Sequence, residues 1–271
     1  MLDTFGYHHT LLKAREFFLS KGLIEVPVQS RLSILAACED PKTVRTFEYD
    51  NIIWPLPQTG QMWLEHELLK NPTQVGFFCV STSYRNEPNP IPGRHEKIFP
   101  MLEFEMKGNQ EDLIQFEIDF VEFLLGEKSI EVDYEDMSAK YGVSILENEH
   151  EEQICKDHSA STILKDFPRR TSPFWNMRRH DGTKEHYKKV DVLIDGIETI
   201  GSAERAVSVE EMKEDFYTIS DGEYAELLFE KFGKERVEAE LNEYLSNDFF
   251  ERFGGGIGMT RLAQAYNRRF L

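Results

Sequence analysis

The sequence has few cysteines, and their arrangement argues against two kinds of scaffold. Cys38, Cys79 and Cys155 are the three cysteines in 271 residues. Their odd number and wide spacing predict neither a disulfide framework nor a cysteine metal site. The N-terminal residues also lack the basic stretch and apolar run of a secretory signal. We therefore expect a cytoplasmic protein.

Long apolar runs are missing as well. No run approaches the roughly 20 residues that a membrane helix needs, so we expect no membrane partner. Hydrophobic residues nevertheless make up 40% of the chain, which is typical of a folded protein. A chain of 271 residues can bury a full core in one domain.

Positive charge is scarce. Lysine and arginine number 31 against 49 aspartates and glutamates, which gives a formal net charge of −18. Proteins that bind nucleic acid draw most of their affinity from lysine and arginine on phosphates. A local basic patch could still bind RNA, but the charge shifts the expectation away from tRNA as the main partner.

The order of helix-type and strand-type segments predicts the fold class. Residues 75–84 are rich in strand formers, and residues 98–107 return as a second strand after a proline-rich loop. Asn109 and Ser208 are typical helix N-caps. Residues 126–165 are polar and acidic, and we interpret them as a small helical insertion. Without a regular βαβ alternation, this order predicts an α+β domain with a largely antiparallel sheet flanked by helices.

Two segments far apart in the chain carry residues suited to ATP. The first begins at Tyr84-Arg85-Asn86-Glu87 and continues through Arg94-His95 to Phe99; the second runs from Gly254 to Arg261. A guanidinium offers paired donors to a phosphate, and glycines let the backbone approach a nucleotide at a helix start. Alone, the first could be a surface ion pair in a turn and the second a helix cap. Together they predict carboxylate activation by ATP.

These segments resemble motifs 2 and 3 of the class II aminoacyl-tRNA synthetases. For the first segment, the resemblance implies that Arg85 binds the α-phosphate and that Glu87 recognises the adenine amino group. Arg94 or His95 would contact the distal phosphates, and Phe99 would stack on adenine, although a core aromatic is the alternative for that ring.

The resemblance of the second segment implies a role for its arginine and its glycines. Arg261 would cover the adenine and contact the γ-phosphate, while the backbone at Gly256 and Gly258 would approach the nucleotide. We expect Arg85 and Arg261 to be the catalytic pair.

A third segment, from Asp191 to Arg205, resembles the aspartyl/asparaginyl/lysyl branch of the family. The resemblance implies that Asp191 and Glu198 hold Mg²⁺ on ATP, as carboxylates suit this ion. It also implies that Ser202 contacts the substrate. Arg205 corresponds to the residue that faces the substrate side chain, which is Arg in aspartate and asparagine members and acidic in lysine members. A buried Arg requires an anion or a carbonyl; the alternative is a structural ion pair with Glu198 or Glu204.

Further segments resemble the amino acid pocket and the dimer element of this branch. Gln61 lies in a segment that lines the pocket, so it should contact the substrate. Aspartate-specific members carry a lysine where this chain has Leu64, which weakens a strict aspartyl interpretation. Residues 172–177 resemble a Pro-Phe-Tyr-x-Met segment of aspartyl enzymes. Residues 22–26 resemble the end of motif 1, which implies a homodimer.

The resemblance covers residues 9–266 and a catalytic domain only. Within residues 1–271 we find no anticodon-binding domain, so we expect a freestanding core that does not charge tRNA. The expected function is ATP-dependent formation of an aminoacyl-adenylate from aspartate or an asparagine-like amino acid. Transfer to ammonia, an amine or a carrier would follow, as in synthetase-related asparagine synthetases. The alternatives are a non-catalytic regulatory paralogue and a ligase that modifies a protein or a tRNA.

Overall fold

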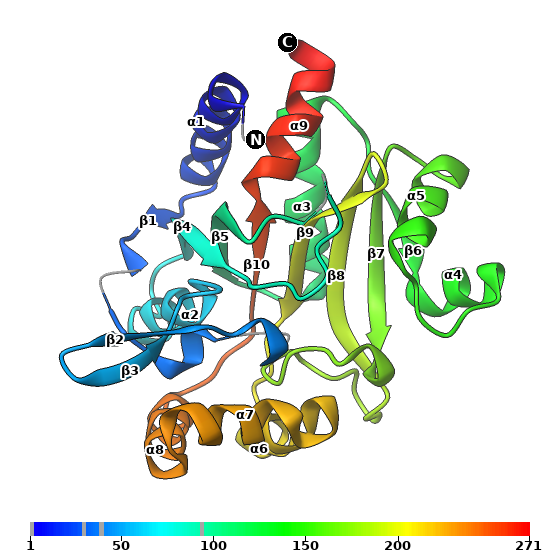
Figure 1. Ribbon diagram of the computed structural model, residues 1–271. Helices are drawn as coiled ribbons and strands as arrows, with labels where there is room; N and C mark the ends of the chain where they lie inside the picture. Colours follow the sequence, from blue (N-terminus) through cyan, green and yellow to red (C-terminus); the bar gives the residue numbers. More distant parts are fainter. Residues whose placement is uncertain (1–2, 29–30, 38–40, 93–94) are drawn as a thin grey trace.

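A mostly antiparallel sheet forms the centre of the molecule (Figure 1). The computed structural model describes residues 3–28, 31–37, 41–92 and 95–271. In spatial order, the strands of the described sheet are β1 (Ile24–Glu25), β4 (Gly76–Tyr84), β5 (Ile98–Lys107), β10 (Arg252–Gly258), β9 (Ile197–Glu204), β8 (His186–Ile194), β7 (Ser161–Pro168) and β6 (Ile130–Asp133). The two edge pairings, β1 with β4 and β6 with β7, are parallel, and the other pairings are antiparallel. The predicted α+β fold with a largely antiparallel sheet is confirmed.

One face of the sheet carries the main apolar core. Three helices cover it: α1 (Thr4–Ser20), α3 (Gln110–Leu125) and α9 (Met259–Phe270). Phe18 of α1 stacks on Phe78 of β4, with ring centroids 5.3 Å apart, and Phe104 of β5 lies 4.9 Å from Phe116 of α3. Helix α3 begins where the sequence predicts, because Asn109 and Asp112 form a reciprocal capping box.

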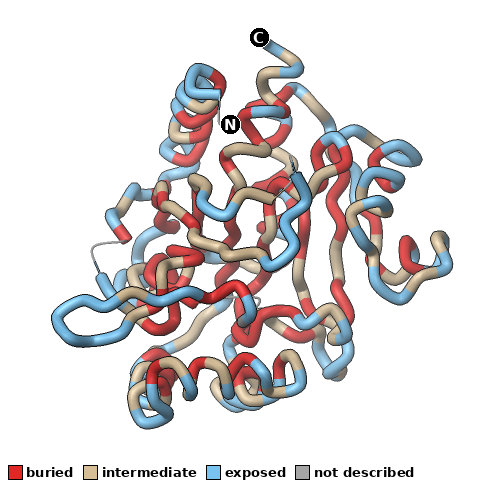
Figure 2. Tube along the Cα trace, viewed as in Figure 1, coloured by how far each residue is buried: buried red, intermediate tan, exposed pale blue. Residues whose placement is uncertain are grey.

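The remaining helices lie on the opposite face and at the ends of the sheet. Helix α2 (Gln61–Lys70) packs on β4 and β5, and the group α6 (Val209–Thr218), α7 (Glu223–Phe232) and α8 (Lys234–Leu245) lies below the strands (Figure 1). The hairpin β2 (Thr46–Tyr49) and β3 (Ile52–Pro55) projects beside α2, and its tip is exposed (Figure 2). Short 3₁₀ turns are η2 (Ile34–Ala36), η3 (Pro41–Thr43), η4 (Arg169–Thr171) and η5 (Ile219–Gly222). No helix of the described ranges has the length and apolar character to cross a membrane.

Two segments differ from the sequence-based expectation. Residues 126–165 contain the helices α4 (Tyr134–Tyr141) and α5 (Asn148–Asp157), but they also supply β6 and the start of β7, so they build one edge of the sheet. The glycine-rich segment, expected as a lead into the last helix, is the strand β10. Its weak strand-forming residues are compensated by pairing with β5 on one side and β9 on the other.

A buried ion pair joins β10 to helices α2 and α8. Arg252 donates to Glu65 through Nε at 2.9 Å and Nη2 at 2.7 Å, and both side chains are fully buried. Tyr244 of α8 donates its hydroxyl to the same carboxylate at 2.7 Å. Asn176 donates to the other oxygen of Glu65 at 2.5 Å. The pair therefore fixes the start of the central strand relative to the helix that carries Gln61.

Removing one partner of this pair should strongly destabilise the fold. Arg252→Met leaves the Glu65 carboxylate buried without its cation, so we expect the free energy of unfolding to fall by about 3–5 kcal/mol in urea denaturation. Adding Glu65→Gln to this variant should recover part of the loss. As a matched control, Arg268→Met breaks a half-exposed pair with Asp195 and should cost below about 1 kcal/mol. Equal losses in the two single variants would contradict the importance given to Arg252.

Candidate active site

One row of residues across four strands forms the floor of the site. The register aligns Asp191 of β8, Gly201 of β9, Gly256 of β10 and Glu103 of β5. Aligned residues point to the same face of a sheet, so two glycines separate two carboxylates. A Cβ atom on Gly256 would lie 2.6 Å from the methyl group of Met101. The floor between the carboxylates is therefore bare backbone.

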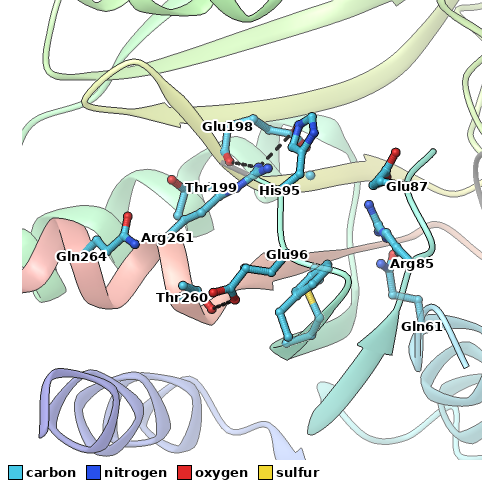
Figure 3. A pocket seen from close by; sticks show the side chains of 15 residues that line it. Gln61, Arg85, Glu87, His95, Glu96, Glu198, Thr199, Thr260, Arg261 and Gln264 are labelled. Carbon is cyan, nitrogen blue, oxygen red and sulfur yellow. Dashed lines mark hydrogen bonds and ion pairs between the residues drawn. The ribbon is translucent and has the colours of Figure 1, made fainter. Parts of the chain in front are cut away.

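A cavity of about 310 Å³ lies on this face of the sheet (Figure 3). It is lined by residues from α2, from the segment between β4 and β5, from β5, β9 and β10, and from the first turns of α9. The residues predicted from the sequence that line it are Gln61, Arg85, Glu87, His95, Phe99, Glu198, Gly256, Gly258 and Arg261. Those that sequence reasoning missed are Glu96, Met101, Thr199, Gly201, Thr260 and Gln264. The structure thus brings both sequence motifs to one cavity.

Arg85 and Phe99 form one end of the cavity. The guanidinium carbon of Arg85 is 5.7 Å from the centroid of the Phe99 ring, which is a cation–π arrangement. The backbone N–H of Arg85 donates to the carbonyl of Lys97 at 2.8 Å, so the two strands are still paired where Arg85 leaves β4. Glu87 lies on the same side in Figure 3. This end offers a cation, an aromatic ring and a carboxylate to one ligand.

Arg261 and Glu198 form the other end (Figure 3). Arg261 lies in the first turn of α9, and its Nη1 donates to the backbone carbonyl of Glu198. Thr260 donates its hydroxyl to Glu96 at 2.9 Å, which connects this turn to the segment before β5. A helix N-terminus beside a cavity favours an anionic ligand, and Arg261 adds a positive charge there.

Asp191 and Glu198 meet above Gly201. The position that a Cβ of Gly201 would take lies 3.0 Å from Oε1 of Glu198 and 3.6 Å from Oδ1 of Asp191. Oδ1 of Asp191 is buried and has no hydrogen-bond partner among the described residues, while Oδ2 accepts from Lys189 at 2.5 Å. Burial raises the pKa of Asp191 to about 7, with Lys189 opposing this and Glu198 adding to it.

This donor set fits Mg²⁺ better than a closed metal cage. In the ranges that the structure describes, no group of three or more His, Cys, Asp or Glu side chains could hold an ion. Mg²⁺ usually keeps several waters and takes only one or two protein carboxylates, with substrate phosphates as further ligands. The unpartnered oxygen of Asp191 and the nearby Glu198 carboxylate match that pattern.

Three predicted residues of the described ranges are absent from the lining of this cavity: Asp191, Ser202 and Arg205. Ser202 follows Gly201 in β9, so its side chain points to the opposite face, where its hydroxyl donates to the carbonyl of Val190 at 3.0 Å and lies beside Glu117. The structure therefore places the Ser202 side chain away from the cavity in which its substrate contact was expected. Arg94 lies outside the described residues, and its expected role stays a prediction.

Arg205 is buried, and its ion-pair partner is neither of the two named in the alternative of a structural ion pair. It is 2% exposed, and its Nε donates to Glu105 at 3.0 Å while its Nη2 donates to Gln61 at 2.5 Å. Glu204, one of the two partners named in that alternative, pairs with Arg178 and Lys188. Burial raises the pKa of the Glu105 carboxyl, the Arg205 guanidinium opposes this rise, and Glu65 adds to it. Nε and Nη2 of Arg205 both donate to the Glu105 carboxylate, and this paired contact is the geometry of an ionised pair.

Glu103 fixes the segment that carries Gln61. Its two oxygens accept from the backbone N–H of Gly60 at 2.9 and 2.8 Å, and from the hydroxyls of Thr59 and Ser81. Burial raises the pKa of Glu103, and these hydrogen bonds oppose the rise. The start of α2 is thus held against the sheet, which places Gln61 at the cavity wall.

Comparison with known proteins gives the family. The family model for tRNA synthetases class II (D, K and N) matches residues 3–266. No curated protein sequence matches the chain.

Solved structures of that family share the fold. The asparaginyl-tRNA synthetase from Pyrococcus horikoshii complexed with asparaginyl-adenylate has a TM-score of 0.79 and 16% identity over 97% of this chain and 64% of its own. The Entamoeba histolytica asparaginyl-tRNA synthetase in complex with asparaginyl-adenylate has a TM-score of 0.75 and 17% identity, over 96% of this chain and 62% of its own. The aspartyl tRNA synthetase from Entamoeba histolytica has a TM-score of 0.71 and 16% identity, over 96% of this chain and 54% of its own. The chain spans less than two thirds of the length of these proteins. The match over nearly all of its residues shows that the chain belongs to the class II tRNA synthetase family of the D, K and N type.

Proposed function

We propose that this protein uses ATP to convert an aspartate- or asparagine-like amino acid into an aminoacyl-adenylate, with release of pyrophosphate. One observation carries the proposal: a single cavity contains Arg85 and Phe99 at one end and Arg261 and Glu198 at the other, above a floor of glycine backbone. Activation of amino acids by ATP is the chemistry of the family. Two of the similar structures are complexes with asparaginyl-adenylate.

The arginines suit the charge changes of this reaction. An oxygen of the amino acid carboxylate attacks the α-phosphorus, and pyrophosphate leaves with the bonding electrons. No proton has to move at the reacting atoms, so positioning and charge stabilisation supply most of the catalysis. Arg85 is the group proposed for the α-phosphate and the attacking carboxylate, and Arg261 for the phosphates that leave. Phe99 and Glu87 are proposed to bind the adenine, as an apolar surface and a hydrogen-bond acceptor.

Asp191 and Glu198 are proposed to hold Mg²⁺ on the ATP phosphates. The bound ion would offset the negative charge that the phosphates bring into the cavity. Lys189 orients the Asp191 carboxylate through one oxygen and leaves the other directed toward Gly201.

The acyl group is then proposed to pass to ammonia, an amine or a carrier, as in an asparagine synthetase-like ligase. The formal net charge of −18 supports such a small or weakly charged acceptor over a polyanion like tRNA. Analysis of the product formed when ammonium is added would test amide formation directly.

Helix α1 is the basis for proposing a homodimer. Phe5, Leu12 and Leu19 are 78%, 50% and 58% exposed and follow one another at intervals of seven residues, so they form one stripe. The neighbouring β1 is the edge strand of the sheet and is only two residues long. An exposed apolar stripe beside an open sheet edge suits a second copy of the chain.

Pyrophosphate exchange into ATP tests the adenylation. With Mg²⁺ and asparagine or aspartate, the purified protein should exchange labelled pyrophosphate, and Arg85→Ala should slow the exchange by about 10²–10³-fold because a charge-stabilising donor is lost. Arg268→Ala removes a guanidinium far from the cavity and should leave the rate unchanged. If none of the twenty amino acids supports exchange by the wild type, the proposed function is wrong.

Calorimetry of ATP binding tests the metal site. We expect Mg²⁺ to tighten ATP binding to the wild type, and Asp191→Asn or Glu198→Gln to remove most of that gain because a carboxylate ligand is lost. Glu96→Gln changes a carboxylate of the same cavity that is engaged with Thr260, so its Mg²⁺ dependence should match the wild type. If Mg²⁺ tightens ATP binding to Asp191→Asn and Glu198→Gln as much as to the wild type, the ion binds elsewhere.

Light scattering after size exclusion tests the dimer. The wild type should elute with twice the mass of the 31.7 kDa chain. Leu12→Glu should shift it toward the monomer, because a carboxylate would be buried in the interface. Lys13→Glu, on the same helix but in an exposed ion pair, is the control. A monomeric wild type at micromolar concentration would exclude the dimer.

A further inference from the structure

A second, smaller cavity adjoins the first at Gln61. It has a volume of about 30 Å³ and is lined by Glu65, Asn176 and Arg205, among others. Gln61 lines both cavities, so it forms the wall between them. A space of this size is enough for a small polar group but not for a nucleotide.

Asn176 lines this small cavity and carries an unsatisfied hydrogen-bond acceptor. The residue is 1% exposed, and its Nδ2 donates to Glu65 at 2.5 Å. Its Oδ1 is buried and has no partner in the described part of the chain. Rotating the amide would point Oδ1 at the Glu65 carboxylate, which is itself an acceptor, so the orientation is fixed. Oδ1 therefore lacks a donor, and an occupant of the cavity that Asn176 lines is a source of one.

Arg205 also lines this cavity. Its Nε and Nη2 are engaged by Glu105 and Gln61. None of the hydrogen bonds found between described residues uses its Nη1. The cavity therefore also offers a donor, which requires an acceptor from the occupant.

A carboxamide can satisfy both the acceptor of Asn176 and the donor of Arg205, whereas a carboxylate can satisfy only the donor. The carbonyl oxygen of a carboxamide accepts from Arg205, and its NH₂ group donates to Asn176. A carboxylate has acceptors only, so it would leave Oδ1 of Asn176 facing another acceptor in a buried site.

The surrounding charges favour the same ligand. Four charged side chains surround the subsite, and all are buried. Glu65, Glu105 and Arg252 have no exposed surface, and Arg205 is 2% exposed. When all four are ionised their charges cancel. A neutral side chain keeps that balance, whereas a carboxylate adds a buried charge without a counter-ion, which is costly.

We propose that Asn176 makes this subsite specific for a carboxamide side chain, so that the amino acid activated in the neighbouring cavity is asparagine rather than aspartate. This inference rests on the proposed function and narrows it. With asparagine as the substrate, synthesis of asparagine from aspartate and ammonia is excluded, and an amine or a carrier remains as acceptor.

Calorimetric titration with three amino acids tests the proposal, in the presence of Mg²⁺ and α,β-methylene-ATP so that no turnover occurs. The ligands are asparagine, aspartate and 2-amino-4-oxopentanoate, the methyl ketone in which CH₃ replaces the NH₂ of the amide. Asparagine should bind about 100-fold more tightly than aspartate and at least about tenfold more tightly than the ketone, because only the amide satisfies Asn176.

Substitution of Asn176 separates its effect from that of charge. In Asn176→Ala, asparagine and the ketone should bind with affinities within about threefold of each other, because the acceptor is gone. Asn71→Ala changes an exposed asparagine and should keep the wild-type preferences. Should Asn176→Ala fail to fold, the three wild-type affinities alone decide the matter.

Equal or tighter binding of aspartate would overturn the proposal, as would equal binding of asparagine and the ketone by the wild type or an absence of amino acid binding. Pyrophosphate exchange then reports on the proposed function separately. Asparagine binding without exchange would retain the specificity and reject adenylation. Exchange with aspartate alone would retain adenylation and reject the specificity.

Discussion

Two buried arginine–glutamate pairs control the arrangement of the site. Arg252, at the start of β10, pairs with Glu65 of α2, and Arg205, which directly follows β9, pairs with Glu105 of β5. Buried ion pairs contribute little net stability, but an unpaired member is costly, so each pair allows one relative position of its elements. Here the elements are β5, β9 and β10, which are three of the four strands that form the floor, and the helix that carries Gln61. The geometry of the site therefore depends on charge pairing more than on apolar packing.

The glycines of β9 and β10 make a ligand surface from the middle of a sheet. Gly201 and Gly256 lie where side chains would otherwise fill the face, and a Cβ on either would contact Glu198 or Met101. Glycine weakens a strand because it adds no side-chain packing and more backbone entropy in the unfolded state. Hydrogen bonding of β10 on both sides compensates for this. Function and stability are thus divided between the two faces, because Phe104 and its neighbours on the opposite face carry the core.

The sequence predicted what depends on neighbouring residues and missed what depends on pairing. The cap at Asn109 and the strand that ends just before Arg85 are local patterns, and the structure contains both. The side of the sheet to which Ser202 points was not predictable. A shift of one residue along a strand moves a side chain to the opposite face, and the register is set by strands distant in the sequence. The partner of Arg205 lies 100 residues away in Glu105, and no short pattern connects them. Glu65 did leave a signal, since it follows Gln61 by one helical turn and so shares its face.

Specificity in such a site does not follow from an arginine alone. A free buried guanidinium would favour an anion, and on that argument Arg205 points to aspartate as readily as to asparagine. Glu105 changes this, because it neutralises Arg205 and engages two of its nitrogens, which leaves the guanidinium to act as a neutral hydrogen-bond donor would. The choice between acid and amide then passes to the nearest group that can tell a donor from an acceptor. Within the described structure that group is Asn176, whose orientation is set by Glu65, so the residue that holds β10 in place also sets the polarity of the subsite.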